Sequence, residues 1–242
     1  MSQDDNRDAR TVSLLMLDTH AHIAPDVTPA QVTALGNVHV FAVTRSIAEA
    51  RIVARRNDAN LTWGLGVHPG KPDALAAYND NTFRRALDYF TLVGEVGMER
   101  RGDRVRQREV FDSILTACAD RPVLISIHST GRTKDVLEAL TEQPHPGAIL
   151  HWFNGTSDEI ERAAALGCYF SVNAAMAPET IAHMPVERLL TETDFPSSRR
   201  KTQASKPGDV HAIERLITDI HQTDARRIAH TNLDALRRAT RP

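Results

Sequence analysis

Leu14-Leu15-Met16-Leu17 runs directly into Asp18-Thr19-His20-Ala21-His22, and this stretch decides how the rest of the chain is interpreted. The apolar residues predict a buried strand. Side chains along a strand alternate between its two faces, so Asp18, His20 and His22 are expected on one side. Two imidazoles one residue apart can bind a metal ion, and a carboxylate can orient one ring from behind. The alternative interpretation is a pair of surface histidines.

Composition and charge limit the possible functions. The chain has 242 residues, of which 41% are hydrophobic, and a single α/β barrel commonly has this length. Its formal net charge of −2 and pI of about 6.6 argue against a broad basic groove for duplex nucleic acid. A nuclease that takes a strand end into a metal pocket is still compatible, because the cations offset phosphate charge. Two basic clusters, residues 100–106 and 199–201, are interpreted as solvated surface or, alternatively, as substrate contacts.

Several features predict a cytoplasmic protein. No apolar run approaches the ~18 residues that a membrane span requires, and no signal peptide is visible. Cys118 and Cys168 stand in apolar contexts outside any Cys-x-x-Cys pattern, so we expect buried free thiols. Residues 1–12 are predicted to be a polar tail, and residues 13–242 a single hydrolase domain.

Short apolar runs alternate with longer amphipathic stretches from Leu14 onward, which predicts βα units around a parallel sheet and therefore a single (β/α)8 barrel. The predicted strands are Leu14–Leu17, Val38–Val43, Leu61–Val67, Thr91–Val96, Val123–Ile127, Ala148–Leu150, Cys168–Val172 and Arg188–Thr191. Predicted helices include Ile47–Arg56, Val105–Ala119, Lys134–Leu140, Asp158–Leu166 and Val210–Ile220.

Polar residues of metal-binding type stand at the ends of these strands, which in a barrel meet at the mouth where active sites are built. They are His20, His22, His68, Glu95, His128, His151 and Asp194. The other six of the 11 histidines stand away from the carboxyl ends of the predicted strands and are interpreted as surface or structural: His39, His145, His183, His211, His221 and His230.

This ligand set predicts a metal site with room for two ions. His20, His22, Glu95 and Asp194 can bind one cation, and Glu95, His128 and His151 a second. A carboxylate that bridges two ions places them to hold both the attacking and the leaving oxygen of a phosphate, with water as nucleophile. Mixed imidazole and carboxylate ligands suit Zn²⁺, Mn²⁺ or Mg²⁺. A closed structural zinc site normally uses cysteine, and two cysteines are too few.

Six motifs in order resemble the signatures of the TatD family, which comprises TIM-barrel, metal-dependent deoxyribonucleases within the wider amidohydrolase-like group. They are Asp18-Thr19-His20-Ala21-His22, Gly66-Val67-His68-Pro69, Gly94-Glu95-Val96-Gly97, Ile127-His128-Ser129, Leu150-His151-Trp152-Phe153-Asn154-Gly155 and Glu192-Thr193-Asp194-Phe195-Pro196. Thr231-Asn232 resembles the family's closing helix motif.

The resemblance implies roles for individual residues. His20 and His22 match the first-strand ligands, and Glu95 the bridging carboxylate. His128 and His151 match the second-ion histidines. Asp194 matches the last ligand, beside the reactive water, so Asp194 and Glu95 are the expected catalytic pair. Positions near substrate are matched by His68, Asn154 and Glu192.

Each of these three substrate positions has a structural alternative: Glu192 orients a neighbour, for example, or His68 shapes a loop. Asp18 is expected to support a ligand histidine rather than to bind metal.

The chain also departs from the family pattern. Met98-Glu99-Arg100 stands where a Leu-Asp pair is usual, so Glu99 is expected to replace that aspartate with a longer reach. Arg132 follows His128 later than the usual arginine does, and is expected either to reach a phosphate or to lie on the surface.

Flanking segments such as residues 167–173 and 184–194 are similar to the TatD-like nucleases of Qat anti-phage defence systems. That similarity implies partner proteins from the same operon.

Three functions therefore compete. The first is a phosphodiesterase that uses two divalent ions to hydrolyse DNA from single-strand ends. The second is an amidohydrolase or lactonase; many of these bridge their metals with a carbamylated lysine, and no lysine stands at the fourth or fifth strand end here. The third is a catalytically silent subunit that binds partners. Oligomeric state is left open.

Overall fold

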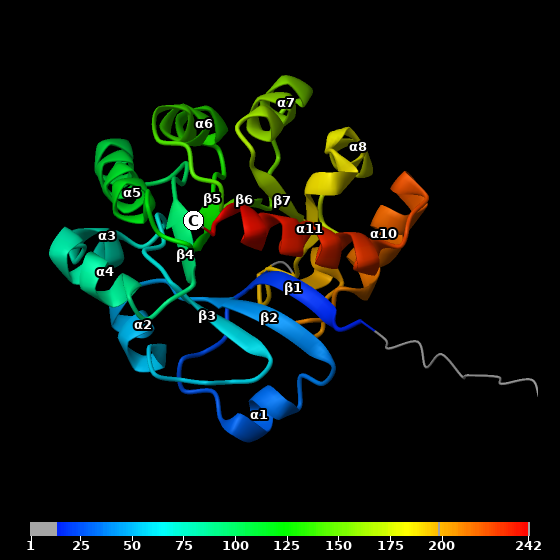
Figure 1. Ribbon diagram of the computed structural model, residues 1–242, viewed down its shortest axis with the longest axis horizontal. Helices are drawn as coiled ribbons and strands as arrows, with labels where there is room; N and C mark the ends of the chain where they lie inside the picture. The colour runs from blue at the N-terminus through cyan, green and yellow to red at the C-terminus, as the bar shows by residue number, and fades with distance from the viewer. Residues whose placement is uncertain (1–13, 198, 242) are drawn as a thin grey trace, which may run out of the picture.

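The computed structural model describes residues 14–197 and 199–241, and it forms an eight-stranded parallel barrel surrounded by helices (Figure 1). The predicted tail, residues 1–12, lies outside the described residues. The strands are β1 (Met16–Ala21), β2 (Val38–Val43), β3 (Leu61–Leu65), β4 (Leu92–Gly97), β5 (Leu124–His128), β6 (Ala148–His151), β7 (Tyr169–Val172) and β8 (Leu189–Thr191). The predicted (β/α)8 fold is confirmed.

Helices follow the strands and cover the outside of the barrel (Figure 1). They are α1 (Pro29–Thr33), α2 (Ile47–Val53), α3 (Pro72–Ala76), α4 (Asp80–Leu87), α5 (Arg104–Cys118), α6 (Thr133–Glu142), α7 (Ser157–Ala165), α8 (Pro178–His183), α9 (Arg199–Thr202), α10 (His211–His221) and α11 (Ala225–Ala239), with a 3₁₀ turn at Val186–Arg188. The sequence pattern did not resolve α1, α3 and α8, because each is only five or six residues long.

The barrel is closed by a seam between β1 and the segment at and after β8. Thr19 Oγ1 donates to the carbonyl of Thr191 at 3.0 Å. Past the strand ends, Asp194 N donates to His20 O at 2.9 Å, and His22 N donates to Phe195 O at 2.7 Å. These bonds fix the ends of β1 and β8 side by side, so the histidines of one and the aspartate of the other enter the mouth together.

The opposite end of the barrel is covered by α11, which lies across it (Figure 1). Leu233 and Leu236 of this helix join Leu17, Phe41 and Leu190 in one buried apolar cluster. Asn232 Nδ2 donates to the carbonyls of Val186 and Leu189, both at 2.8 Å, and so fixes the entry to β8. One end of the barrel is therefore sealed by packing, and the other is left for polar side chains.

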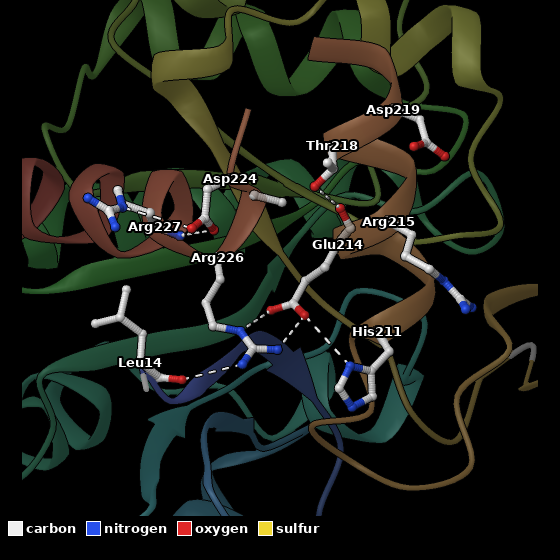
Figure 2. Close-up of a pocket in the computed structure, with 10 residues that line it drawn as sticks. Leu14, His211, Glu214, Arg215, Thr218, Asp219, Asp224, Arg226 and Arg227 are labelled. Atoms are coloured by element: carbon white, nitrogen blue, oxygen red, sulfur yellow. Dashed lines mark hydrogen bonds and ion pairs between the residues drawn. The ribbon is translucent and has the colours of Figure 1, made fainter. Parts of the chain in front are cut away.

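The groove between α10 and α11 has a volume of about 780 Å³ and lies beside Leu14, which precedes β1 (Figure 2). The Arg226 side chain spans this groove and donates two hydrogen bonds to the Glu214 carboxylate, at 2.8 and 2.6 Å. Since Leu14 precedes the strand whose far end carries His20, this groove belongs to the end of the barrel away from the mouth.

Cys118 and Cys168 are buried and unpaired, as predicted. Over the described residues, no helix combines the length and the apolar character that crossing a membrane requires.

Gly97 is required where β4 and β5 approach each other. Its φ is +127°, and a Cβ there would lie 2.2 Å from the carbonyl oxygen of His128. We expect Gly97→Ala to lower the free energy of unfolding by about 2–4 kcal/mol, measured by urea denaturation. Gly36→Ala is the control, because Gly36 also has a positive φ, +85°, but nothing lies within 4 Å of its added Cβ. Equal losses in the two variants would contradict the steric explanation.

Candidate metal centre

The strand ends bring seven predicted side chains to one mouth. His20 lies within β1 rather than after it, because β1 extends to Ala21. Glu95 lies on β4, and His128 and His151 end β5 and β6. His22, His68 and Asp194 lie in the loops after β1, β3 and β8.

Glu95 is at the centre of this cluster, and its two carboxylate oxygens face two different groups of imidazoles. Oε1 lies 2.6 Å from His128 Nδ1 and 3.0 Å from His151 Nε2. Oε2 lies 3.2 Å from both His22 Nε2 and His68 Nε2, and 3.8 Å from His20 Nε2. A carboxylate placed in this way can serve ligand groups on both of its sides.

Asp194 completes the side of the cluster that His20 and His22 form. Its Oδ1 lies 3.8 Å from His20 Nε2 and 3.7 Å from His22 Nε2. Asp194 has φ +47°, a conformation that non-glycine residues rarely adopt and that often marks functional sites. Its backbone N–H is bound to His20 O, so the seam of the barrel holds this conformation.

These residues fit a divalent cation. Buried His20 Nε2 and Glu95 Oε2 have no hydrogen-bond partner among the described residues, although buried polar atoms are normally satisfied. Three overlapping groups place their ligand atoms within 4.8 Å of one another: His20, His22 and Glu95; His20, His151 and Asp194; and His68, Glu95 and His128. Imidazole nitrogens and carboxylate oxygens in such a group suit Zn²⁺ or Mn²⁺.

In the absence of metal, the buried charge of Glu95 is compensated by histidine. Burial by itself raises the pKa of Glu95, but the charge and hydrogen bonds of His128 and His151 outweigh burial and hold that pKa well below its usual range. Conversely, burial lowers the pKa of His151, and its hydrogen bonds to Glu192 and Glu95 outweigh this and raise it well above its usual value. Likewise Glu95 raises the pKa of His128 against the effect of burial. The neighbouring carboxylates thus favour the protonated forms of His128 and His151, whose positive charge offsets that of Glu95.

Two other histidines of the cluster, His20 and His68, favour the neutral imidazole, which can donate a lone pair to a metal. Burial and the neighbouring His151 lower the pKa of His20 well below its usual value. Burial lowers the pKa of His68 to about 4. Burial also raises the pKa of Asp194, to about 6.

A second layer of side chains orients the rings. Ser126 Oγ lies 2.7 Å from His20 Nδ1, which leaves Nε2 directed at Glu95 and Asp194. Glu99 Oε2 lies 2.9 Å from His128 Nε2. Our sequence reasoning missed Ser126, although its position two residues before His128 on the same strand placed it on the same face.

Asp18 contacts the ligand histidine His20 through the backbone of that residue and not through its ring. The Asp18 carboxylate accepts hydrogen bonds from the backbone N–H groups of Thr193, at 2.9 Å, and Gly208, at 2.7 Å. It also accepts from the Thr193 hydroxyl at 2.7 Å and from His20 N at 3.3 Å. Asp18 thus joins β1 to the loops that follow β8, and Ser126 is the residue that contacts the His20 ring.

Glu192 does not lie where a substrate contact requires. Its side chain is fully buried, accepts a hydrogen bond from Asn173 Nδ2 at 2.9 Å, and lies 3.7 Å from His151 Nδ1. Since His151 Nε2 faces Glu95, Glu192 is behind the ring. Burial therefore excludes direct contact with a large substrate and favours the alternative, that Glu192 orients a neighbour.

The other three residues predicted near substrate have different surroundings. His68 is drawn into the cluster, with Nε2 3.2 Å from Glu95 Oε2, so a ligand role is available to it as well. Asn154 is exposed at the mouth, and its Nδ2 donates to Trp152 O at 3.2 Å. Arg132 is half-buried and donates to Arg100 O at 3.2 Å. Their contacts with substrate stay predictions.

The barrel and its mouth define a TIM-barrel protein with a candidate metal centre of histidine and carboxylate ligands. The chain belongs to the TatD related DNase family, whose model matches residues 17–241.

Individual relatives are more distant. The "3′-5′ ssDNA/RNA exonuclease TatD" of Pantoea sp. (strain At-9b) is 29% identical over 147 residues, which cover 54% of this chain and 56% of that protein. The "uncharacterized metal-dependent hydrolase YabD" of Bacillus subtilis is 28% identical over 46% of this chain and 48% of its own length. The chain thus aligns with about half the length of these curated relatives.

A solved structure shares the fold over nearly the whole chain. The crystal structure of YjjV, a TatD homologue from Escherichia coli, matches with a TM-score of 0.75 at 21% identity, covering 91% of this chain and 95% of that one. At this identity the likeness supports the fold.

The affinity for a divalent ion should fall as pH is lowered. Asp194, with its pKa of about 6, and the histidines with raised pKa hold protons below those values, and a metal must displace these protons. We expect the dissociation constant for Mn²⁺, measured calorimetrically, to rise by up to about tenfold per pH unit for each proton displaced. Asp194→Asn is expected to remove the part of this dependence near pH 6. An affinity that does not change with pH would contradict the assignment of these ligands.

Ser126→Ala should weaken metal binding without unfolding the protein. Loss of the hydrogen bond to His20 Nδ1 frees the ring to rotate, and such outer contacts are typically worth about 10–100-fold in metal affinity. Thr62→Ala is the control, because Thr62 makes a similar bond to a histidine outside the cluster, His39, at 2.8 Å. Unchanged Mn²⁺ affinity in Ser126→Ala would show that Ser126 does not orient His20.

Proposed function

We propose that this protein is a metal-dependent nuclease that hydrolyses phosphodiester bonds at the ends of single-stranded DNA. The proposal further assigns two divalent ions to the mouth, with Glu95 between them. The observation that carries this proposal is the placement of histidines around the two oxygens of the Glu95 carboxylate. His20 and His22 lie on the Oε2 side, and His128 and His151 lie on the Oε1 side.

We assign the residues to two ligand groups. His20, His22 and Asp194 would hold the first ion together with Glu95, and His128 and His151 would hold the second. His68 stands at Glu95 Oε2 and can contribute to either the metal shell or the substrate. When bound, a pair of ions of this kind neutralises phosphate charge and lowers the pKa of a coordinated water.

Asp194 is the proposed proton acceptor for the attacking water. Burial raises its pKa to about 6 in the metal-free protein, so its carboxylate accepts a proton more readily than an exposed aspartate does. Ser126, Glu192 and Glu99 keep the three histidine rings in place while the proton moves. The barrel seam holds Asp194 beside His20, so acceptor and ligands move as one unit.

The sequence motifs favour the phosphate substrate over the amide or lactone alternative. Glu95 occupies the bridging position, and the residues that end β4 and β5, Gly97 and His128, are not lysine. Lactonases do share the fold, as the lactonase Lmo2620 of Listeria monocytogenes shows with a TM-score of 0.61 at 11% identity. The chain's slight net negative charge argues against a broad basic groove for duplex nucleic acid and is compatible with a strand end in a metal pocket.

We further propose that the protein works in the cytoplasm within a Qat-type anti-phage defence system. The support is the similarity of its flanking segments, such as residues 167–173 and 184–194, to TatD-like nucleases of that system. Co-purification of tagged protein with the other proteins of its operon tests this. Recovery of the chain alone, from cells that express the complete operon, would contradict it.

Hydrolysis itself is tested with single-stranded DNA labelled at one end and purified protein with Mg²⁺ or Mn²⁺. We expect nucleotide release that EDTA stops. Glu95→Gln and Asp194→Asn should lower the rate by at least about 100-fold, because loss of a direct ligand exceeds the effect of an outer contact.

Glu187→Gln is the matched control, since Glu187 is exposed at the other end of the barrel. Equal rates in Glu95→Gln and the wild type would refute the assignment. Hydrolysis of lactones or amides with no release from DNA would favour the second function.

A further inference from the structure

Both basic clusters of the sequence follow strand ends at the mouth of the barrel. Residues 100–103 lie in the loop after β4, and residues 199–201 lie in α9 after β8, beginning five residues beyond Asp194. In the strand order β1 to β8, these two strands are separated by three others on one side and, across the seam, by three on the other. The clusters therefore stand on opposite sides of the metal centre.

Four cations in these clusters are available to a ligand. Arg100, Arg101, Arg200 and Lys201 are exposed, and within residues 14–197 and 199–241 their side chains have no ion-pair or hydrogen-bond partner. The other arginines of these two clusters, Arg104, Arg106 and Arg199, already have partners. Arg104, for example, binds the Asp135 carboxylate, with one contact at 3.0 Å.

On the β4 side, the free cations are joined to the metal cluster by short contacts. Arg101 N donates to Glu99 Oε1 at 3.3 Å, and Glu99 Oε2 lies 2.9 Å from His128 Nε2. Buried Gln107 fixes this loop, because it donates to Arg101 O at 2.7 Å and to Pro69 O at 3.3 Å, and accepts from Glu99 N at 3.0 Å. Arg101 therefore lies on a loop that these hydrogen bonds hold in place beside the metal centre.

The same loop borders a hollow of about 360 Å³. Its walls include Pro69, Leu75 and the arginines Arg101 and Arg106. Arg106 is held there by hydrogen bonds to Leu75 O, at 3.0 and 3.3 Å. Apolar surface next to guanidinium groups is suited to stacking a nucleobase.

On the β8 side, the link to the metal cluster runs through an aromatic ring. Phe195 follows Asp194 directly, and its carbonyl accepts from His22 N at 2.7 Å. The guanidinium of Arg199 lies over the Phe195 ring, 5.2 Å from its centroid. Arg200 and Lys201 continue from this anchored residue as exposed charges.

We infer that a single nucleic-acid strand crosses the mouth between these clusters, its phosphates bound by Arg200 and Lys201 on one side and by Arg100 and Arg101 on the other. The inference rests on the proposed function, and it adds the binding path to it. The bond to be cleaved then lies over Glu95, and a base on the β4 side reaches the hollow beside Arg101.

Salt dependence of binding tests this path without any hydrolysis. A fluorescent oligothymidylate of about 12 nucleotides is titrated with the full chain in EDTA at several salt concentrations. Each phosphate contact contributes about 0.7 to the slope of log affinity against log salt for a single strand. Arg100→Ala/Arg101→Ala and Arg200→Ala/Lys201→Ala should therefore each lower the slope by about 1.4.

Arg51→Ala/Arg55→Ala is the control, because it removes two equally exposed charges in and just after α2, on the outside of the barrel. We expect it to keep the wild-type slope. A wild-type slope in either mouth variant, or an equal loss in the control, would overturn the crossing path. Since no metal is present, the result is independent of the hydrolysis assay: a lowered slope with an inactive enzyme would support the path while refuting the proposed activity.

Discussion

The buried carboxylate of Glu95 is the constraint on which the rest of the mouth depends. An unpaired charge in a protein interior is strongly unfavourable, so the Glu95 carboxylate requires a compensating positive charge. Histidines from four other strand ends or loops surround it: His20 and His22 from β1, His68 from β3, His128 from β5 and His151 from β6. Protons on His128 and His151 satisfy the charge without metal, and divalent cations can replace those protons.

The scaffold converts this electrostatic requirement into fixed geometry. Asp18 hydrogen bonds to Thr193 and Gly208 hold β1 against the loops beyond β8, which places Asp194 next to His20. At the other side, Gln107 joins the loop that carries His68 to the loop that carries Glu99. Neither Asp18 nor Gln107 points at the centre of the cluster, yet the hydrogen bonds of both residues fix the positions of the segments that carry the ligand side chains. Substitutions at these positions are thus expected to act through geometry rather than through charge.

The sequence alone could predict the barrel, because apolar runs of strand length recur in step with amphipathic helices, and a set of metal-type side chains stands at the strand ends. It could not predict which atoms meet. Nothing in the sequence around Ser126, which lies in an apolar strand, indicates that its Oγ lies 2.7 Å from His20 Nδ1 in the folded protein. Glu192 lies two residues from Asp194, but the turn at Asp194, with φ +47°, sends one carboxylate into the mouth and leaves the other behind His151. The hydrogen-bond partners of Asp18 lie about 175 to 190 residues away along the chain, so the sequence near Asp18 does not indicate them.

The most direct test of this account is a crystal structure of the protein with Mn²⁺, in which anomalous scattering locates each ion. We predict two peaks about 3.5–4 Å apart, one on each side of the Glu95 carboxylate. The first should contact His20, His22 and Asp194, and the second His128 and His151. A single peak, or two peaks that Glu95 does not join, would contradict the central role given to this carboxylate.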